Sequence, residues 1–252
     1  MELLIVSLAS LLAGFVDSIV GGGGLILVPA LFAVFPSTHP ATLFGTNKGA
    51  SVWGTAFATW QFSRRVEMRW AALLPAAGAG FVAAFAGAWL VTVVSPDYLR
   101  KVLPVVLLAV LIYTLLRKDL GRTHRPRFSG GKERLVAASI GALIGFYDGF
   151  FGPGTGSFLV FLLVRLLGYD FLSASAGAKL INTATNVAAL ILFAAKGHIW
   201  WHFVGAMAVA NVVGSLLGTR LALKHGTGFV RTVFIVVVSA LILKTGYDAF
   251  LR

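Results

Sequence analysis

Long apolar runs separated by short polar gaps fill most of the chain. In the first half the runs cover residues 3–20, 25–35, 41–62, 70–94 and 102–116. In the second half they cover residues 135–151, 158–167, 175–195, 199–223 and 232–251. An α-helix needs about 20 apolar residues to cross a bilayer, and most of these runs approach or exceed that length. The pattern predicts an all-α polytopic membrane protein embedded in the lipid bilayer.

Two glycine-rich stretches interrupt this pattern. Residues 14–24 read Gly-Phe-Val-Asp-Ser-Ile-Val-Gly-Gly-Gly-Gly, and residues 145–156 read Gly-Phe-Tyr-Asp-Gly-Phe-Phe-Gly-Pro-Gly-Thr-Gly. Glycine inside a helix costs about 1 kcal/mol relative to alanine, and proline costs about 3 kcal/mol. Each stretch therefore predicts a broken helix at membrane depth. The apolar run after each break is too short to cross the bilayer alone.

The two halves of the sequence align without a gap when one is shifted by 131 residues. The matched pairs include Gly14 with Gly145, Asp17 with Asp148, Gly21 with Gly152, Lys48 with Lys179, Trp70 with Trp201, and Gly87 with Gly218. One offset held across about 119 residues indicates a duplication, and internal repeats are common in secondary transporters. We predict a first membrane repeat at residues 1–121, a basic linker at 122–133 and a second membrane repeat at 134–252.

Two topologies agree with the repeat. If each glycine break lies within one crossing element, each half crosses four times, which gives about eight segments in two parallel tandem repeats. If each broken pair of helices turns back, each half crosses three times and the halves are inverted. The bias of Lys and Arg toward the linker side is nearly the same for both topologies, so the positive-inside rule does not choose between them. We favour eight segments.

Composition narrows the class of protein. Of the 252 residues, 58% are hydrophobic and 12% are charged, against about 25% charged in soluble domains. The net charge of +12 does not indicate nucleic-acid binding, because the basic residues gather in gaps between apolar runs, as in cytoplasmic loops. Cysteine is absent, which excludes disulfides and thiolate ligands. The N-terminus lacks the basic region of a secretory signal, so we expect the first run to be retained as a helix.

Two lysines lie inside apolar runs, and they match under the shift. On insertion scales a lysine at mid-membrane costs about 2.5–3.5 kcal/mol, which favours a functional role over chance placement. Snorkelling to the interface is the alternative. Each lysine also begins a polar helix face with i, i+3, i+7 spacing. The two faces are Lys48, Ser51 and Thr55 in the first half and Lys179, Asn182 and Asn186 in the second, with Thr46 and Asn47 extending the first. Interhelical hydrogen bonding explains the hydroxyl groups, but it explains two matched cations less well.

The glycine clusters favour anion binding. A helix that begins after a glycine loop presents free N–H groups and the positive end of its dipole, and glycine lets an ion approach the backbone. The clusters are Gly22, Gly23 and Gly24, before a helix expected from Leu25, and Gly154, Thr155 and Gly156, before a helix expected from Ser157. A helix kink is the simpler alternative. Asp17 and Asp148 precede the clusters and are expected either to accept protons or to pair with Lys48 and Lys179.

Other chemistry finds little support. His39, His198 and His202 do not form a convincing metal set, because one lies in a turn and the other two lack a nearby carboxylate. No nucleophile and base stand out, and no phosphate-binding loop of the G-x-x-x-x-G-K-[ST] type is present. We therefore expect no enzymatic activity, no metal and no cofactor.

Three motifs resemble the sulfite exporter TauE/SafE family of bacterial membrane proteins. They are Gly-x-x-Asp-x-x-x-Gly-Gly-Gly-Gly from Gly14, Gly45-Thr46-Asn47-Lys48, and Ala178-Lys179-x-x-Asn182-x-x-x-Asn186. The resemblance covers essentially the whole chain and implies export or uptake of sulfite, organosulfonates or other small anions. Pro153 and Thr155 depart from the glycines of the first cluster, so the two breaks need not bind equally.

The function predicted is secondary transport, as an exporter, of a small anion such as sulfite or an organosulfonate across the bacterial inner (cytoplasmic) membrane. An anion channel, or an uptake permease for another small oxyanion or carboxylate, is the nearest alternative. A structural membrane subunit that transports nothing is the alternative from another class. A homodimer is compatible with the sequence, which does not require one.

Overall fold

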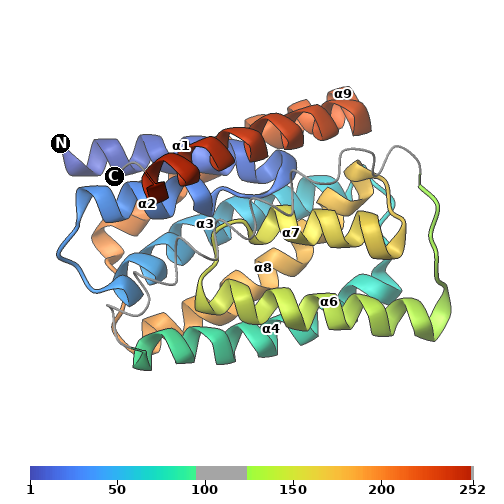
Figure 1. The fold of residues 1–252 in the computed structure, drawn as a ribbon, viewed down its shortest axis with the longest axis horizontal. Helices are drawn as coiled ribbons and strands as arrows, with labels where there is room; N and C mark the ends of the chain where they lie inside the picture. The colour runs from blue at the N-terminus through green and yellow to red at the C-terminus, as the bar shows by residue number, and fades with distance from the viewer. Residues whose placement is uncertain (95–123, 251–252) are drawn as a thin grey trace.

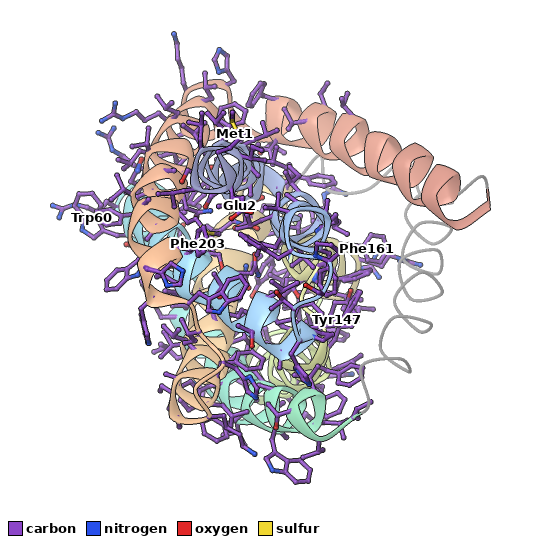
Figure 2. All side chains as sticks on the ribbon, turned by 90° about the vertical axis from the view of Figure 1, so that its left-hand side faces the viewer. Met1, Glu2, Trp60, Tyr147, Phe161 and Phe203 are labelled. Atoms are coloured by element: carbon purple, nitrogen blue, oxygen red, sulfur yellow. The ribbon has the colours of Figure 1, made fainter. Side chains whose placement is uncertain are left out.

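The computed structural model describes residues 1–94 and 124–250, and these residues form a bundle of helices (Figure 1). The helices are α1 (Glu2–Val20), α2 (Gly24–Val34), α3 (Pro40–Ser63), α4 (Trp70–Val93), α6 (Gly130–Phe150), α7 (Thr155–Leu162), η1 (Leu163–Leu167), α8 (Phe171–Ala195) and α9 (Trp201–Phe250). The apolar run at 102–116 and the first residues of the predicted linker lie outside the described residues. At Gly226 the backbone of α9 is not helical (φ 70°, ψ −162°), and its two parts diverge there (Figure 2).

The chain reverses direction at both glycine breaks. After α1 the backbone turns at Gly21 and Gly22, which have positive φ values of 80° and 102°. α2 then returns along α1, and Leu27 and Leu31 share one buried apolar cluster with Val6 and Ala13. The second break turns at Gly152 and Gly154 (φ 91° and 87°), and α7 returns beside α6 (Figure 1). Each broken pair is thus a helical hairpin, which differs from the continuous crossing element that we favoured.

Each hairpin packs against a helix from the other half of the chain. Along α6, Gly141, Gly145 and Gly149 lie one turn apart and face the backbone of α4 at Ala76, Gly80 and Ala84 in turn. Along α1, Ser10 and Gly14 face Met207 and Asn211 of α9 in the same way. Both pairs run parallel, and small residues let the backbones approach closely, as is common between membrane helices. The two halves are therefore intertwined.

The helices α3 and α8 cross at the centre of the bundle (Figure 1). They run antiparallel, because Thr59 contacts Thr183 (2.9 Å) while Thr55 contacts Asn186 (3.4 Å). Local sequence defines where each begins. Pro40 occupies the first turn of α3, and Asp170 caps α8 by accepting hydrogen bonds from the N–H groups of Leu172 and Ser173.

The outer surface is strongly apolar. Four described helices are long and apolar enough to cross a membrane: α1, α4, α8 and the Trp201–Val230 part of α9. Large apolar side chains on several helices point outward; Trp60, for example, is 55% exposed at the edge of the bundle (Figure 2). Such a surface is expected where lipid replaces water.

Candidate functional site

The tips of the two hairpins and the middle of α3 and α8 enclose a small cavity. It is lined by Ala13, Asp17, Gly22, Gly23, Gly24, Leu27, Asn47, Lys48, Ser51, Thr55, Asp148, Gly152, Gly154, Thr155, Gly156, Asn182, Asn186 and Asn211. Its volume is about 30 Å³. One water needs roughly 10–15 Å³, so the space suits a few waters or one small polar headgroup.

Lys48 is held by groups from two other helices. Its Nζ lies 2.6 Å from Oδ2 of Asp148 on α6 and donates a hydrogen bond to Oδ1 of Asn186 on α8 (2.9 Å). The side chains of Lys48 and Asp148 are only 4% and 1% exposed. Lys48 therefore does not snorkel to an interface but ends inside the bundle beside the cavity.

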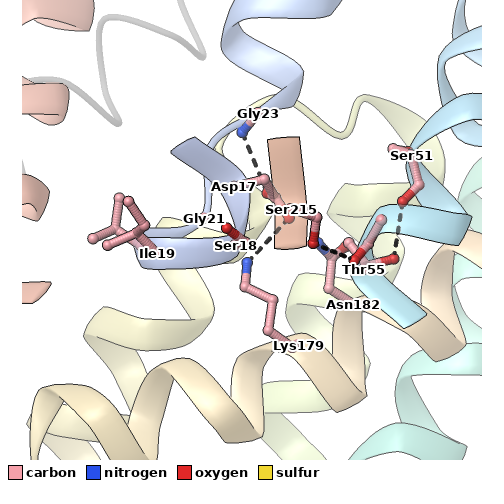
Figure 3. A network of polar contacts seen from close by, with 12 residues as sticks. Asp17, Ser18, Ile19, Gly21, Gly23, Ser51, Thr55, Lys179, Asn182 and Ser215 are labelled. Carbon is pink, nitrogen blue, oxygen red and sulfur yellow. Dashed lines mark hydrogen bonds and ion pairs between the residues drawn. The ribbon is translucent and has the colours of Figure 1, made fainter. Parts of the chain in front are cut away.

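Lys179 makes the corresponding pair from the other half. Its Nζ donates to Oδ2 of Asp17 on α1 (3.1 Å), and Oδ1 of Asp17 accepts a hydrogen bond from the N–H of Gly23 (3.3 Å; Figure 3). The Lys179 side chain is fully buried, whereas Asp17 is 16% exposed. This pair is longer and more open than the pair of Lys48 and Asp148.

The pairing is exchanged between the halves of the chain. Each lysine meets the aspartate of the other half, and the 131-residue shift turns one pair into the other. With all four groups ionised the two positive and two negative charges cancel. A buried charge without a partner is strongly destabilising, so this balance is what lets four ionised groups sit inside an apolar bundle.

Glycine is required where the hairpin tips meet. A Cβ atom on Gly156 would lie 2.5 Å from Cα of Gly21, closer than any real contact. Ser157 fastens the tips together, because its hydroxyl donates to the carbonyl oxygen of Gly21 (3.1 Å). Within the second hairpin, the hydroxyl of Tyr147 donates to the carbonyl oxygen of Pro153 (2.5 Å). The glycine backbone thus forms part of the cavity wall, and side chains larger than glycine at these positions would fill the cavity.

Asn47 places a buried amide beside the cavity. Its side chain is 5% exposed and lines the cavity, yet its Oδ1 has no hydrogen-bond partner among the described residues. A flip of the side-chain amide exchanges its oxygen and nitrogen, so either the acceptor or the donor can face the cavity. Leaving a buried polar group unpaired costs about 1–3 kcal/mol. A polar ligand in the cavity would remove that cost.

The cavity collects twelve of the fourteen residues predicted from sequence. Lys179 stands just outside the lining and reaches it through Asp17. Thr46 lies elsewhere: its Oγ1 accepts a hydrogen bond from the N–H of Trp200 (3.1 Å) and so ties α3 to the start of α9. Thr46 is therefore placed as a structural contact between these helices.

The sequence is similar to known proteins over most of its length. Residues 6–245 match the family described as sulfite exporter TauE/SafE. The chain belongs to this family. It is 38% identical over 240 residues to "Probable membrane transporter protein YfcA" of Escherichia coli K12, covering 95% of this chain and 88% of that protein. It is 35% identical over 236 residues to "Probable membrane transporter protein ORF9" of Sinorhizobium sp, covering 94% and 89%.

A TauE/SafE relative from Haemophilus influenzae, "Probable membrane transporter protein", is 34% identical over 244 residues, covering 94% of this chain and 91% of that protein. No solved structure matches the chain. With its several long apolar helices, this TauE/SafE chain is a multi-pass membrane protein of a transporter family. Membrane transporters are in general not enzymes.

One polar residue of the cavity was not predicted from the sequence of this TauE/SafE protein. Asn211 lines the cavity from α9, and its Nδ2 also donates to the carbonyl oxygen of Ser10 (2.9 Å). It has no match under the shift, because the equivalent position is Gly80. The sequence signal that could have identified it is a single amide in the middle of an apolar run.

The histidines lie elsewhere. His39 and His198 stack with their ring centroids 5.4 Å apart, and among the described residues no three His, Cys, Asp or Glu side chains are grouped to hold a metal.

A second polar cluster ties the helix ends nearest the linker. Glu133 accepts hydrogen bonds from Nε and Nη2 of Arg69 (2.6 and 2.7 Å) and from the hydroxyl of Tyr169 (2.6 Å). The bonds from Arg69 lower the pKa of Glu133, and burial raises the pKa of Tyr169. This cluster joins the starts of α4 and α6 to the turn before α8, remote from the cavity.

Proposed function

We propose that the protein is a secondary transporter of a small oxyanion or sulfonate, such as sulfite, which binds in the central cavity. The observation that carries this proposal is the pair of buried lysines, each held by an aspartate of the other half, beside a polar cavity. Lys48, Lys179, the amides of Asn47, Asn182 and Asn186, and the backbone N–H groups of both breaks would hold the anion. Family membership supports transport, and the family name supports sulfite or a related anion.

We propose an inverted repeat in place of the parallel one. The central helices α3 and α8 run antiparallel, and the two hairpins enter the bundle from opposite ends (Figure 1). Both observations favour a two-fold axis in the plane of the membrane, which is a common transporter design. In this topology α3, α4, α8 and both parts of α9 cross the bilayer, whereas the hairpins α1–α2 and α6–α7 are re-entrant.

The proposed depth of the bilayer agrees with α4. Trp70 and Trp89 are 43% and 51% exposed and stand 19 residues apart on this helix. At a rise of about 1.5 Å per residue this separation is about 28 Å, close to the hydrocarbon thickness of a bilayer, which is about 30 Å. Tryptophan prefers the membrane interface. The cavity would then lie near the midplane, where transporters bind their substrates.

Charge supports a cytoplasmic position for the linker end. Among the described residues outside the cavity, the basic side chains at that end are Arg64, Arg65, Arg69, Arg125, Arg127, Lys132, Arg134, Arg165, Arg220 and Lys224. The opposite end has Lys196. Basic residues are retained on the cytoplasmic side, so we propose this orientation in a bacterial inner membrane.

A flux assay tests the function. The purified protein in proteoliposomes should move sulfite or a sulfonate across the membrane, and Lys48→Ala and Lys179→Ala should each lower the flux at least tenfold. Lys196→Ala is the matched control, because it removes an exposed lysine at the end of α8. Unchanged sulfite flux in both cavity variants would sink the proposed site. Ionic currents too large for transporter turnover would instead indicate the channel, and the absence of both flux and an anion-dependent thermal shift would indicate a structural subunit.

A further inference from the structure

Asp17 occupies the donors that an anion at the first break would need. One carboxylate oxygen takes the N–H of Gly23 (3.3 Å) and the other takes Nζ of Lys179 (3.1 Å; Figure 3). A helix N-terminus and a lysine are two typical partners of a bound oxyanion. The side chain of Asp17 thus stands where the headgroup of an anionic ligand would stand. An anion can reach these donors only if Asp17 leaves them.

Asp148 is placed differently in its own half. It contacts Lys48 at 2.6 Å and is 1% exposed, and within the described part of the chain no hydrogen bond joins it to the N–H groups after the second break. One of these groups is engaged locally, since the N–H of Thr155 donates to the carbonyl oxygen of Gly152 (3.2 Å). Lys48 is further fixed by Asn186. The pair of Lys48 and Asp148 is the shorter and more buried of the two, although its 2.6 Å contact lacks hydrogen-bond geometry at Oδ2 of Asp148. The longer, more open pair of Lys179 and Asp17 is the one that we expect to open.

The charges around the cavity determine how an anion can replace the carboxylate of Asp17. Among the residues that the structure describes, the ionisable groups that face the cavity are Asp17, Lys48 and Asp148, and Lys179 contacts Asp17 from behind. The helices α2 and α7 have no ionisable side chains, and α9 contributes the amide of Asn211. The four charges cancel when the cavity holds no anion. An incoming monoanion would leave a net charge of −1 unless one positive charge came with it. Burying an uncompensated charge costs several kcal/mol by rough estimates, so the exchange needs a compensating proton.

We infer that a monovalent anion and one proton bind together, with Asp17 as the proton acceptor; this rests on the proposed transport function. In the step, Asp17 releases Lys179 and Gly23, its carboxylate takes up one proton from solution, and the anion accepts the hydrogen bonds that Asp17 gave up. The site stays neutral before and after. The same count disfavours a dianion, which would leave a net charge of −1. The structure thus assigns a substrate class, a monovalent sulfonate or hydrogensulfite headgroup, and a coupling ion, the proton.

Methanesulfonate is the probe, because it keeps one negative charge across the working pH range. Its affinity for the purified wild-type protein should fall about tenfold for each unit by which the pH rises, as expected when one proton binds with each anion. Adding the probe to weakly buffered protein should take up one proton per anion bound. Asp17→Asn should bind with an affinity independent of pH, and Glu67→Gln, which removes an exposed carboxylate outside the cavity, should keep the wild-type slope.

In proteoliposomes an inward proton gradient should accumulate methanesulfonate, and clamping the membrane potential should not change the rate. Anion binding with no proton uptake, or a full pH slope in Asp17→Asn, would overturn the inference. So would a slope lost in Asp148→Asn but kept in Asp17→Asn. If Asp17→Asn does not fold, the wild-type proton stoichiometry decides alone. Failure of the transport proposal looks different, since the wild type would then neither bind nor move any of the anions.

Discussion

Asn186 donates a hydrogen bond from Nδ2 to Oγ1 of Thr55 (3.4 Å), and the two residues stand 131 positions apart. They are each other's equivalents under the shift that aligns the two halves. In a two-fold arrangement only residues beside the axis touch their own equivalents. The contact therefore favours the proposed two-fold axis, which would pass between α3 and α8 next to the cavity. The two ion pairs, which interchange under the same shift, would then be related by this axis.

The first prediction concerns the buried pair of Lys48 and Asp148. Replacing Lys48 with methionine leaves a carboxylate that is 1% exposed without its cation. Removing one partner of a buried pair typically costs about 3–5 kcal/mol, whereas replacing both with apolar residues is often close to neutral. Lys48→Met should therefore lower the thermal denaturation midpoint in detergent strongly, and Lys48→Met with Asp148→Leu should restore most of it.

The double variant separates stability from function. It should regain stability but still fail to move anions, because the cation beside the cavity is gone. A double variant as unstable as Lys48→Met alone would contradict the view that charge balance holds this site together.

A second prediction uses two glycines as a matched pair. A Cβ on Gly149 of α6 would collide with the carbonyl group of Ala84 on α4, whereas a Cβ on Gly78 of α4 would meet nothing within 4 Å. Gly149→Ala should separate the two helices and destabilise the protein. Gly78→Ala should be neutral or stabilising by roughly 0.5–1 kcal/mol, because alanine is the better helix former. Thermal denaturation midpoints of both variants check this, and equal midpoints would refute the close packing of α4 on α6.

A third prediction follows from the unpaired amide of Asn47. Asn47→Leu removes a buried polar group that has no partner for Oδ1, so the protein without anion should be more stable than the wild type. The same change removes a proposed ligand group, so stabilisation by added sulfite should shrink. Thermal shift with and without sulfite measures both effects. A variant that loses stability but keeps the full sulfite response would mean that Asn47 serves packing and not binding.

Sequence patterns predicted the helical membrane class and the positions of both breaks, because glycine clusters and apolar runs are local signals. They did not predict that the chain turns back at each break. The same glycines permit a kink or a reversal, and the choice depends on packing partners distant in sequence, such as Met207, which shares a buried apolar cluster with Leu27. Charge counting could not help either, since the linker end is basic in both topologies.

The residues of the candidate site were more predictable than their partners. Lys48 and Lys179 stood out because charge is costly in an apolar helix. That each lysine meets the aspartate of the opposite half depends on α1 packing on α9 and α6 packing on α4, which no local pattern encodes. Thr46 shared the polarity of its neighbours but faces Trp200, because one step along a helix turns a side chain by about 100°.

The last prediction concerns pH and the cluster at the linker end. Arg69 lowers the pKa of Glu133 in the folded protein, so the carboxylate stabilises the fold above its unfolded pKa of about 4.3. That stabilisation is lost as the pH falls below 4.3 and through the lower folded value. The wild type should therefore lose thermal stability steeply below about pH 4. Glu133→Gln should start less stable at pH 7 and show a flatter pH dependence of stability, because no proton binds at that position.

The control is Glu67→Gln, which removes an exposed carboxylate and should follow the wild type. Denaturation midpoints from pH 7 to 3 in one detergent compare the three proteins. If Glu133→Gln keeps the steep loss, the acid sensitivity arises elsewhere, and Arg69 and Glu133 do not act as the clamp between α4 and α6.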